Sequence, residues 1–201
     1  MKGIRNSRKM EVWQFGLIVL LGFGVDLIES SDFYSLTVED LKGNAVPMSV
    51  FKGKMLLIVN VASECGYTDK HYKELVELQK KFDNHDFNIL AFPCNQFGQQ
   101  EPLRNSGIAR FVKNKYNVNF PVFSKIKVVG PGAHPLYKYL YASAKYAPQW
   151  NFAKYLVNRA GKVIQFWSQH YSPLDLENFI DKHVNMAITD EYEVYNVYKE
   201  L

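Results

Sequence analysis

Two apolar segments separated by one helical pattern constrain the fold of this chain more than any other feature. Residues 54–61 and 87–92 are almost continuously apolar, which is typical of strands buried on both faces of a sheet. Between them, Thr68 can cap a helix. The expected buried stripe of that helix is Tyr72, Leu75, Leu78, Gln79 and Phe82. A strand, a helix of about fourteen residues and a second strand form a right-handed βαβ unit, so we expect the two strands to be parallel.

Short β-rich segments on either side of this unit extend it to a larger sheet. Residues 33–38 and 45–49 flank the turn-forming sequence Asp40–Asn44 and predict a small N-terminal hairpin. Residues 152–157 and 162–167 flank a second turn-forming sequence, and they predict an antiparallel hairpin near the end of the domain.

Three further helices complete the expected fold. One should open at residue 105 or 106, and another is marked by the apolar residues of 136–144. The last has clear start signals, with Ser172 as N-cap, Pro173 at the first helical position and Asp175 three residues after the cap. This order predicts an α/β protein with a thioredoxin-like fold, in which helices flank a mixed central sheet and a β-hairpin comes first.

The N-terminal segment has the three-part pattern of a secretory signal. A basic start precedes an apolar stretch over 12–25, which Asp26 ends. As a helix of about 1.5 Å per residue this stretch spans roughly 21 Å, less than the ~30 Å core of a bilayer. Cleavage could follow Gly24, with Ser30 as a second candidate, and an uncleaved anchor or a buried helix is the alternative. We therefore assign 1–24 as a signal peptide or signal anchor of a protein that faces an oxidising compartment.

Charge is concentrated outside the expected domain. Residues 1–11 hold four basic side chains and one acidic, whereas the rest of the chain holds 20 basic against 19 acidic. This balance gives no basis for a nucleic-acid partner. We place the domain at 32–187 and an acidic, tyrosine-rich tail at 188–201. The final Tyr198–Leu201 resembles the Lys-Asp-Glu-Leu retention address of the endoplasmic reticulum, although a frayed polar tail is the alternative.

The only two cysteines follow the two buried strands. Cys65 lies four residues beyond Val61, at the approach to a helix, and Cys94 lies two residues beyond Phe92. Because parallel strands end at one edge of an α/β sheet, where such sheets bind and react, we expect both thiols at that edge. A helix N-terminus stabilises a thiolate, so Cys65 is the stronger candidate for a reactive thiol.

The alternatives to a reactive thiol are two inert buried cysteines or one structural disulfide. A zinc site is disfavoured, because the two cysteines are far apart in sequence and no paired histidines accompany them. The Cys-x-x-Cys spacing of dithiol oxidoreductases is absent, which argues against a simple disulfide exchanger. A reactive thiolate also needs nearby hydrogen-bond donors. The candidate donors are Asn95, Gln96, Gln99, Gln100, Trp150 and Asn151, and spacing alone does not choose among them.

Three segments resemble the signature blocks of the glutathione peroxidases. They are Asn60–Gly66 (N-V-A-S-E-C-G), Leu90–Pro102 (L-A-F-P-C-N-Q-F-G-Q-Q-E-P) and Trp150–Leu156 (W-N-F-A-K-Y-L). The resemblance runs from about residue 33 to about residue 184 and includes a further block over 132–135. Within the family, the chain most resembles the cysteine-containing, secretory-pathway branch related to glutathione peroxidases 7 and 8.

The resemblance assigns roles by position. It implies that Cys65 is the peroxidatic cysteine and that Gln100, Trp150 and Asn151 complete the catalytic tetrad. Cysteine in place of selenocysteine implies a slower nucleophile. Residues 106–120 contain no cysteine, although thioredoxin-dependent relatives place their resolving cysteine in that region. Cys94 is then the only possible resolving cysteine within the chain.

On this resemblance we expect a thiol-dependent peroxidase that acts in the response to oxidative stress. Cys65 would reduce hydrogen peroxide and organic hydroperoxides and become a sulfenic acid. The reductant would be glutathione or a protein dithiol such as that of protein disulfide isomerase, with no cofactor and no metal. The alternative is a peroxide sensor or relay that passes oxidising equivalents to protein disulfide isomerase or another client.

The resemblance also implies a location and an oligomeric state. It favours the secretory pathway, above all the lumen of the endoplasmic reticulum, with secretion or membrane anchoring as alternatives. A membrane is a partner only if the N-terminal segment stays uncleaved. The insertion that builds subunit contacts in tetrameric relatives is missing between Pro121 and Trp150, which favours a monomer.

Overall fold

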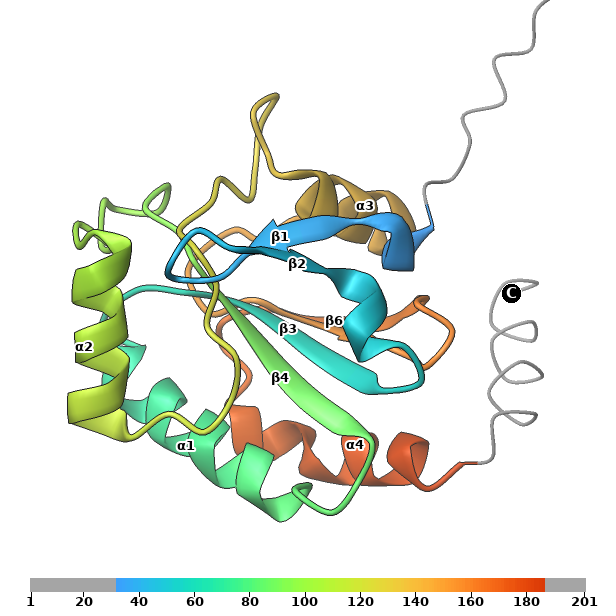
Figure 1. Cartoon of the computed structure of the whole chain (residues 1–201). Coiled ribbons are helices and arrows are strands. Elements are labelled where there is room, and N and C mark those ends of the chain that lie inside the picture. The colour runs from blue at the N-terminus through green and yellow to red at the C-terminus, as the bar shows by residue number, and fades with distance from the viewer. Residues whose placement is uncertain (1–31, 187–201) are drawn as a thin grey trace, which may run out of the picture. The chain divides into compact units, whose positions relative to one another are not determined.

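The computed structural model describes residues 32–186, and at its centre lies a four-stranded mixed sheet with helices on both faces (Figure 1). The strands are β3 (Met55–Val61), β4 (Phe87–Pro93), β5 (Lys154–Val157) and β6 (Val163–Trp167). Their order in the sheet is β4-β3-β5-β6. β3 runs parallel to β4, whereas β5 runs antiparallel to both β3 and β6. The predicted βαβ unit, the second hairpin and the mixed sheet are confirmed.

α1 (Thr68–Lys81) connects β3 to β4, and its apolar stripe is buried as predicted. The prediction that Thr68 caps this helix is wrong, because Tyr67 occupies the N-cap position and Thr68 is the first helical residue. The Thr68 hydroxyl instead accepts the N–H of Cys65 at 3.0 Å and donates to the carbonyl of Ala62 at 2.8 Å. Thr68 therefore fastens the turn that carries Cys65 onto the start of the helix.

The other helices lie close to their predicted positions. They are α2 (Asn105–Tyr116), α3 (Pro135–Ala144) and α4 (Glu177–Val184). The predicted capping box of Ser172 and Asp175 is present. It opens a 3-10 turn, η3 (Pro173–Leu176), and α4 begins only after that turn.

The N-terminal hairpin is confirmed, but its strands are shorter than predicted. They are β1 (Thr37–Glu39) and β2 (Ala45–Pro47), with the 3-10 turns η1 (Phe33–Ser35) and η2 (Met48–Phe51) at their outer ends. Local hydrogen bonds favour these turns over longer strands. The Asp32 side chain accepts the N–H of Tyr34 at 3.2 Å, and the Asp32 carbonyl accepts the N–H of Ser35 at 3.0 Å.

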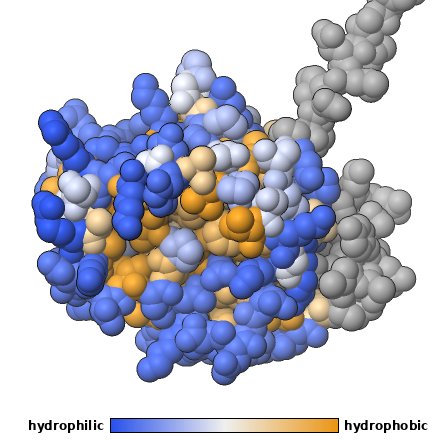
Figure 2. Space-filling view, in the orientation of Figure 1, coloured by the Kyte–Doolittle hydropathy of each residue, from blue (hydrophilic) through white to orange (hydrophobic). Residues whose placement is uncertain are grey.

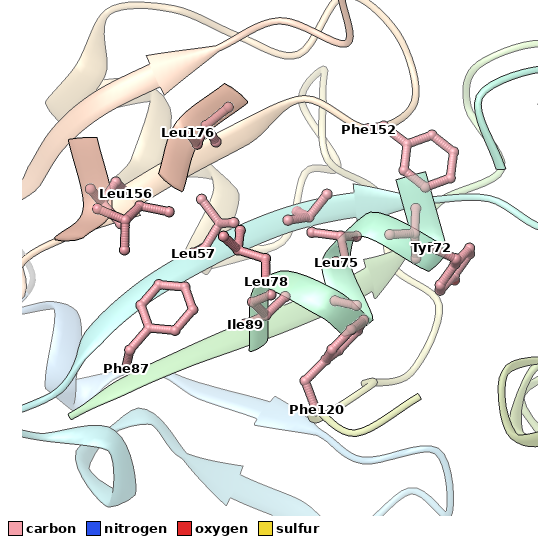
Figure 3. Close-up of a cluster of buried hydrophobic side chains, with 14 of the residues drawn as sticks. Leu57, Tyr72, Leu75, Leu78, Phe87, Ile89, Phe120, Phe152, Leu156 and Leu176 are labelled. Atoms are coloured by element: carbon pink, nitrogen blue, oxygen red, sulfur yellow. The ribbon is translucent and has the colours of Figure 1, made fainter. Parts of the chain in front are cut away.

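Alternating side chains of the sheet build two separate cores. α1, α2 and α4 cover one face, and α3 and the hairpin cover the other (Figure 1). The core on the first face, here the α1 core, includes Leu57, Leu75, Leu78, Ile89, Leu156 and Leu176 (Figure 3). The core on the second face, here the α3 core, includes Leu56, Ile58, Leu90, Leu136 and Leu140. Each fully buried leucine stabilises the fold by roughly 2 kcal/mol, so both cores contribute.

A shallow groove of about 340 Å³ lies between α2 and the segment that follows it. Its lining is Leu41, Ala109, Val112, Lys113, Asn117, Val118, Phe120 and Val122. Figure 2 shows apolar side chains at the centre of one face, surrounded by hydrophilic ones. Neither cysteine lines this groove.

The predicted leader over 1–24 and the predicted tail over 188–201 lie outside the described residues. Both stay predictions, as does the domain boundary at 32–187. Within residues 32–186, no helix combines the length and the apolar character that a membrane span requires.

Candidate active site

Cys65 lies in the turn that joins β3 to α1. Its side chain is buried, with 7% of the residue exposed. The N–H of Cys65 donates to the Thr68 hydroxyl, and the N–H of Thr68 donates back to the Cys65 carbonyl at 2.9 Å. This pair of bonds holds Cys65 at the N-terminal end of α1, where the helix dipole favours a negative charge.

Gln100 belongs to the loop that follows β4 at the same edge of the sheet. The N–H of Glu64 donates to the Gln100 carbonyl at 2.9 Å, so the residue next to Cys65 is bonded directly to Gln100. Gly98 and Gln99 precede Gln100 with φ angles of 65° and 54°. This left-handed backbone is favourable for glycine and strained for glutamine, and it turns the loop back toward the Cys65 turn.

Trp150 and Asn151 come shortly before β5. Hydrogen bonds with Asn60, on β3, hold this part of the chain in place. The side-chain amide of Asn60 donates to the Trp150 carbonyl at 3.0 Å, and the Asn60 carbonyl accepts the N–H of Phe152 at 2.6 Å. Phe152 has a φ of 68°, so the chain turns sharply after Asn151. Asn60 thereby sets the position of this turn.

The side chains of Asn151 and Gln100 meet. The Nδ2 atom of Asn151 donates to Gln100 Oε1 at 3.0 Å and to the Phe97 carbonyl at 3.2 Å. The indole of Trp150 lies against the same loop, since a Cβ atom on Gly98 would be 3.3 Å from Trp150 Cη2 and 3.4 Å from Gln100 Cδ. The side-chain oxygen of Gln100 points to Asn151, so the NH₂ group of Gln100 points away from the Asn151 side-chain amide.

The structure therefore brings three of the four predicted tetrad residues into one contact group. Cys65 joins this group through the Glu64–Gln100 bond and shares the α1 core with Trp150, which packs against that core. Such an arrangement bonds a loop that carries side-chain amides to the residue next to a thiol at a helix N-terminus.

Cys94 has a different environment. It is fully buried in the α3 core, whereas Cys65 belongs to the α1 core. Its Sγ atom accepts the N–H of Gln96 at 3.4 Å and contacts Gln96 Oε1 at 3.6 Å. Burial raises the pKa of the Cys94 thiol, with the N–H of Gln96 opposing the shift. Both cysteines are free thiols in this structure.

The remaining predicted donors have structural contacts. The Asn95 side chain accepts the N–H of Glu101 at 2.9 Å. The Gln96 side chain accepts the N–H of Val128 at 2.6 Å, and Gln99 is exposed. No group of three or more His, Cys, Asp or Glu side chains within residues 32–186 could hold a metal ion.

Comparisons with known proteins decide the family. The family model described as Glutathione peroxidase matches residues 33–141, more than half of the chain. The chain belongs to the glutathione peroxidase family. It is 47% identical to probable glutathione peroxidase 8 of Mus musculus over 79% of this chain and 74% of that protein. It is also 47% identical to glutathione peroxidase 7 of Bos taurus, over 81% of this chain and 87% of that protein.

Solved structures agree with the family assignment. The crystal structure of T. cruzi GPX1 is 34% identical with a TM-score of 0.63, covering 76% of this chain and 96% of its own. A thioredoxin-family thiol:disulfide interchange protein of Chlorobium tepidum, 13% identical with a TM-score of 0.59, shares the fold. The predicted thioredoxin-like fold, the likeness to glutathione peroxidases 7 and 8 and the prediction of a peroxidase enzyme are confirmed.

Sequence reasoning missed two buried charged side chains beside the site of this glutathione peroxidase. Glu101 and Lys154 are both fully buried. Ser63 Oγ donates to Glu101 Oε1 at 2.9 Å, and the Lys154 ammonium donates to the Phe152 carbonyl at 2.8 Å. The available signal was their place inside two of the family blocks, directly after Gln100 and three residues after Asn151.

His71 on α1 is a third buried ionisable group. Its ring lies edge-on to Phe152 with 5.0 Å between ring centroids. Burial lowers the pKa of His71 to about 3, and the positive charges of Lys154 and Lys70 act in the same direction. His71 is therefore neutral at physiological pH, and it packs as an aromatic ring beneath the Phe152 turn.

Proposed function

We propose that this glutathione peroxidase reduces hydrogen peroxide and organic hydroperoxides through the thiolate of Cys65. The thiolate attacks one peroxide oxygen and becomes a sulfenic acid, and the other oxygen leaves with a proton as water or an alcohol. The Asn151–Gln100 hydrogen bond at 3.0 Å is the observation that carries this proposal. It orients an amide beside the Cys65 turn, where N–H donors can stabilise the departing oxygen.

We propose that the thiol that reduces the sulfenic acid comes from another molecule. Cys94 is fully buried in the α3 core, on the opposite face of the sheet from the core of Cys65. An external thiol, either glutathione or a protein dithiol, condenses with the sulfenic acid and releases water. A second thiol then attacks the mixed disulfide and regenerates the Cys65 thiolate.

A relay function is the second candidate, and the burial of Cys94 favours it as much as glutathione-dependent turnover. An intermolecular disulfide at Cys65 is an obligatory intermediate when no internal thiol can react. In a relay, that disulfide passes to a client such as protein disulfide isomerase, whose oxidation is then the product. We propose that this exchange takes place in the secretory pathway, in the lumen of the endoplasmic reticulum, and that the protein acts as a monomer.

Peroxide consumption with two alternative reductants tests both candidates. Purified protein with hydrogen peroxide is supplied either with glutathione or with reduced protein disulfide isomerase. Cys65→Ser should abolish turnover with both, and full activity of that variant would refute the proposal. A preference of at least tenfold for the isomerase, with oxidised isomerase accumulating, assigns the relay, and the opposite preference assigns the scavenger.

A further inference from the structure

Glu101 belongs to the Gln100 loop and its side chain contacts the Cys65 turn, and nothing in the proposed chemistry uses it. We infer that Glu101 is a positioning residue, which holds the Cys65 turn against the Gln100 loop through its hydrogen bond to Ser63. This inference rests on the proposed function, because it concerns the rate at which peroxide oxidises Cys65.

The bond between Ser63 and Glu101 joins the two loops beside their functional residues. Ser63 lies two residues before Cys65, and Glu101 directly follows Gln100. Ser63 Oγ donates to Glu101 Oε1 at 2.9 Å, and both residues are buried, at 8% and 0% exposed. A hydrogen bond screened from water in this way resists competition from solvent.

A neighbouring backbone hydrogen bond connects the Cys65 turn and the Gln100 loop at a second point. The N–H of Glu64 donates to the Gln100 carbonyl at 2.9 Å, next to the Ser63–Glu101 contact. Two adjacent bonds fix both the separation and the rotation of the loops, whereas a single bond would act as a hinge. Thr68 still fastens the Cys65 turn to α1 without the Ser63–Glu101 bond, but of these two adjacent bonds between the turn and the Gln100 loop only the Glu64–Gln100 bond would remain.

The main chain of Glu101 is anchored on both sides. Its N–H donates to Asn95 Oδ1 at 2.9 Å, and its carbonyl accepts the Lys125 ammonium at 2.9 Å. Lys125 also donates to the Leu103 carbonyl at 2.8 Å. These anchors leave the Glu101 side chain a narrow choice of directions, and the observed one points to Ser63.

The Glu101 carboxyl group is subject to both hydrogen bonding and charge. Burial raises the pKa of Glu101, while the Ser63 hydroxyl and the Lys125 ammonium oppose that shift. The second carboxyl oxygen, Oε2, is buried and makes no hydrogen bond within the described part of the chain. The backbone N–H groups of Ser63 and Leu103 oppose the upward shift as well, so several donors compensate the carboxyl group.

Three variants separate hydrogen bonding from charge. Ser63→Ala removes the donor, Glu101→Leu removes the acceptor, and Glu101→Gln keeps an acceptor oxygen without the charge. The measurement is a single turnover without reductant, in which hydrogen peroxide oxidises Cys65 and the sulfenic acid is trapped with dimedone and counted by mass spectrometry. Ser143→Ala, at an exposed serine of α3, is the matched control for the serine substitution.

We expect Ser63→Ala and Glu101→Leu to slow Cys65 oxidation about tenfold, as the loss of one buried hydrogen bond does. Glu101→Gln and the Ser143→Ala control should stay within about twofold of the unmodified protein. The rate at which glutathione reduces pre-oxidised protein should not change. General destabilisation of the protein would not slow oxidation while leaving reduction unchanged. Nor would it spare the Glu101→Gln variant.

Two results would overturn the inference. One is a normal oxidation rate in both Ser63→Ala and Glu101→Leu, and the other is a Glu101→Gln variant as slow as Glu101→Leu. If Glu101→Leu does not fold, Ser63→Ala and Glu101→Gln still decide the question. A failure of the proposed function looks different, because the unmodified protein itself would then form no sulfenic acid at Cys65.

Discussion

Replacing Lys154 by methionine should remove a pH-dependent component of the stability of this protein. Lys154 is fully buried, and its Nζ atom donates to the carbonyls of Phe152 at 2.8 Å and Tyr171 at 2.7 Å. Burial lowers the pKa of Lys154 from 10.5 to about 7, although the carboxylates of Glu74 and Asp175 oppose the shift. A neutral amine has two N–H donors, which matches the two carbonyls that accept from it.

The sign of the effect follows from the two protonation states. Between pH 7 and pH 10.5 the unfolded chain carries a proton on Lys154 that the folded protein lacks, so stability rises with pH across this window. Below pH 7 both states are protonated and the destabilisation by the buried charge is complete. The slope is about 1.4 kcal/mol per pH unit. From about pH 7 to about pH 8.5 the gain is therefore about 2 kcal/mol.

Urea denaturation at constant ionic strength, with reducing agent present, measures this gain. The unmodified protein should gain about 2 kcal/mol between about pH 7 and about pH 8.5, and Lys154→Met should gain almost none. The variant leaves two carbonyls without their donor, so only the change with pH is diagnostic, and the absolute stability is not. Lys138→Met, at an exposed lysine of α3, is the control and should keep the full slope. Equal slopes in the protein and in Lys154→Met would refute the reasoning.

Three further predictions concern the site and the cores. Gly98 has a φ of 65° and faces Trp150, so Gly98→Ala should cost roughly 1 kcal/mol of stability and slow peroxide reduction several-fold in a stopped-flow assay. Gly43→Ala, at a φ of 86° in open space, should cost as much stability and leave the rate unchanged. Burial lowers the pKa of His71 to about 3, so the free energy of unfolding should fall by about 2 kcal/mol between about pH 6.5 and about pH 4.5. In His71→Phe it should fall little over the same range, and guanidinium titrations at both pH values measure the difference. Cys94→Ser should keep glutathione-dependent turnover within about twofold, and an inactive variant would show that Cys94 resolves the sulfenic acid.

The sheet could be predicted from the sequence because its strands are buried on both faces. The apolar runs at 54–61 and 87–92 differ from β3 and β4 by one residue at one end each. Elements at the surface were harder to predict, since local hydrogen bonds decide their ends. Asp32 converts the start of the predicted first strand into a 3-10 turn, and Thr68 bonds backward to the Cys65 turn instead of capping α1.

The candidate site was predictable only in part. Gln100 and Asn151 stand in family blocks, and the structure shows their side chains bonded to each other. Glu101 and Lys154 were missed, because charged side chains are rarely fully buried and no pattern in a single sequence marks an exception. The sequence also did not show which of the loop amides lies at the site. The structure shows, for example, that the Asn95 side chain accepts the backbone N–H of Glu101.

The alternation of side chains along β4 also places the two thiols in different cores. Cys94 follows Leu90 and Phe92 at intervals of two residues, so its side chain lies on the same face of the sheet and packs in the α3 core. Cys65 belongs to the α1 core. The N–H of Cys94 still donates to the Val61 carbonyl at 3.0 Å, as an extension of the β3–β4 ladder. We therefore expect that a bond between the two sulfurs would require Cys94 to turn out of its core. An external thiol needs only to reach Cys65. The burial of Cys94 on the other face of the sheet therefore favours an intermolecular disulfide.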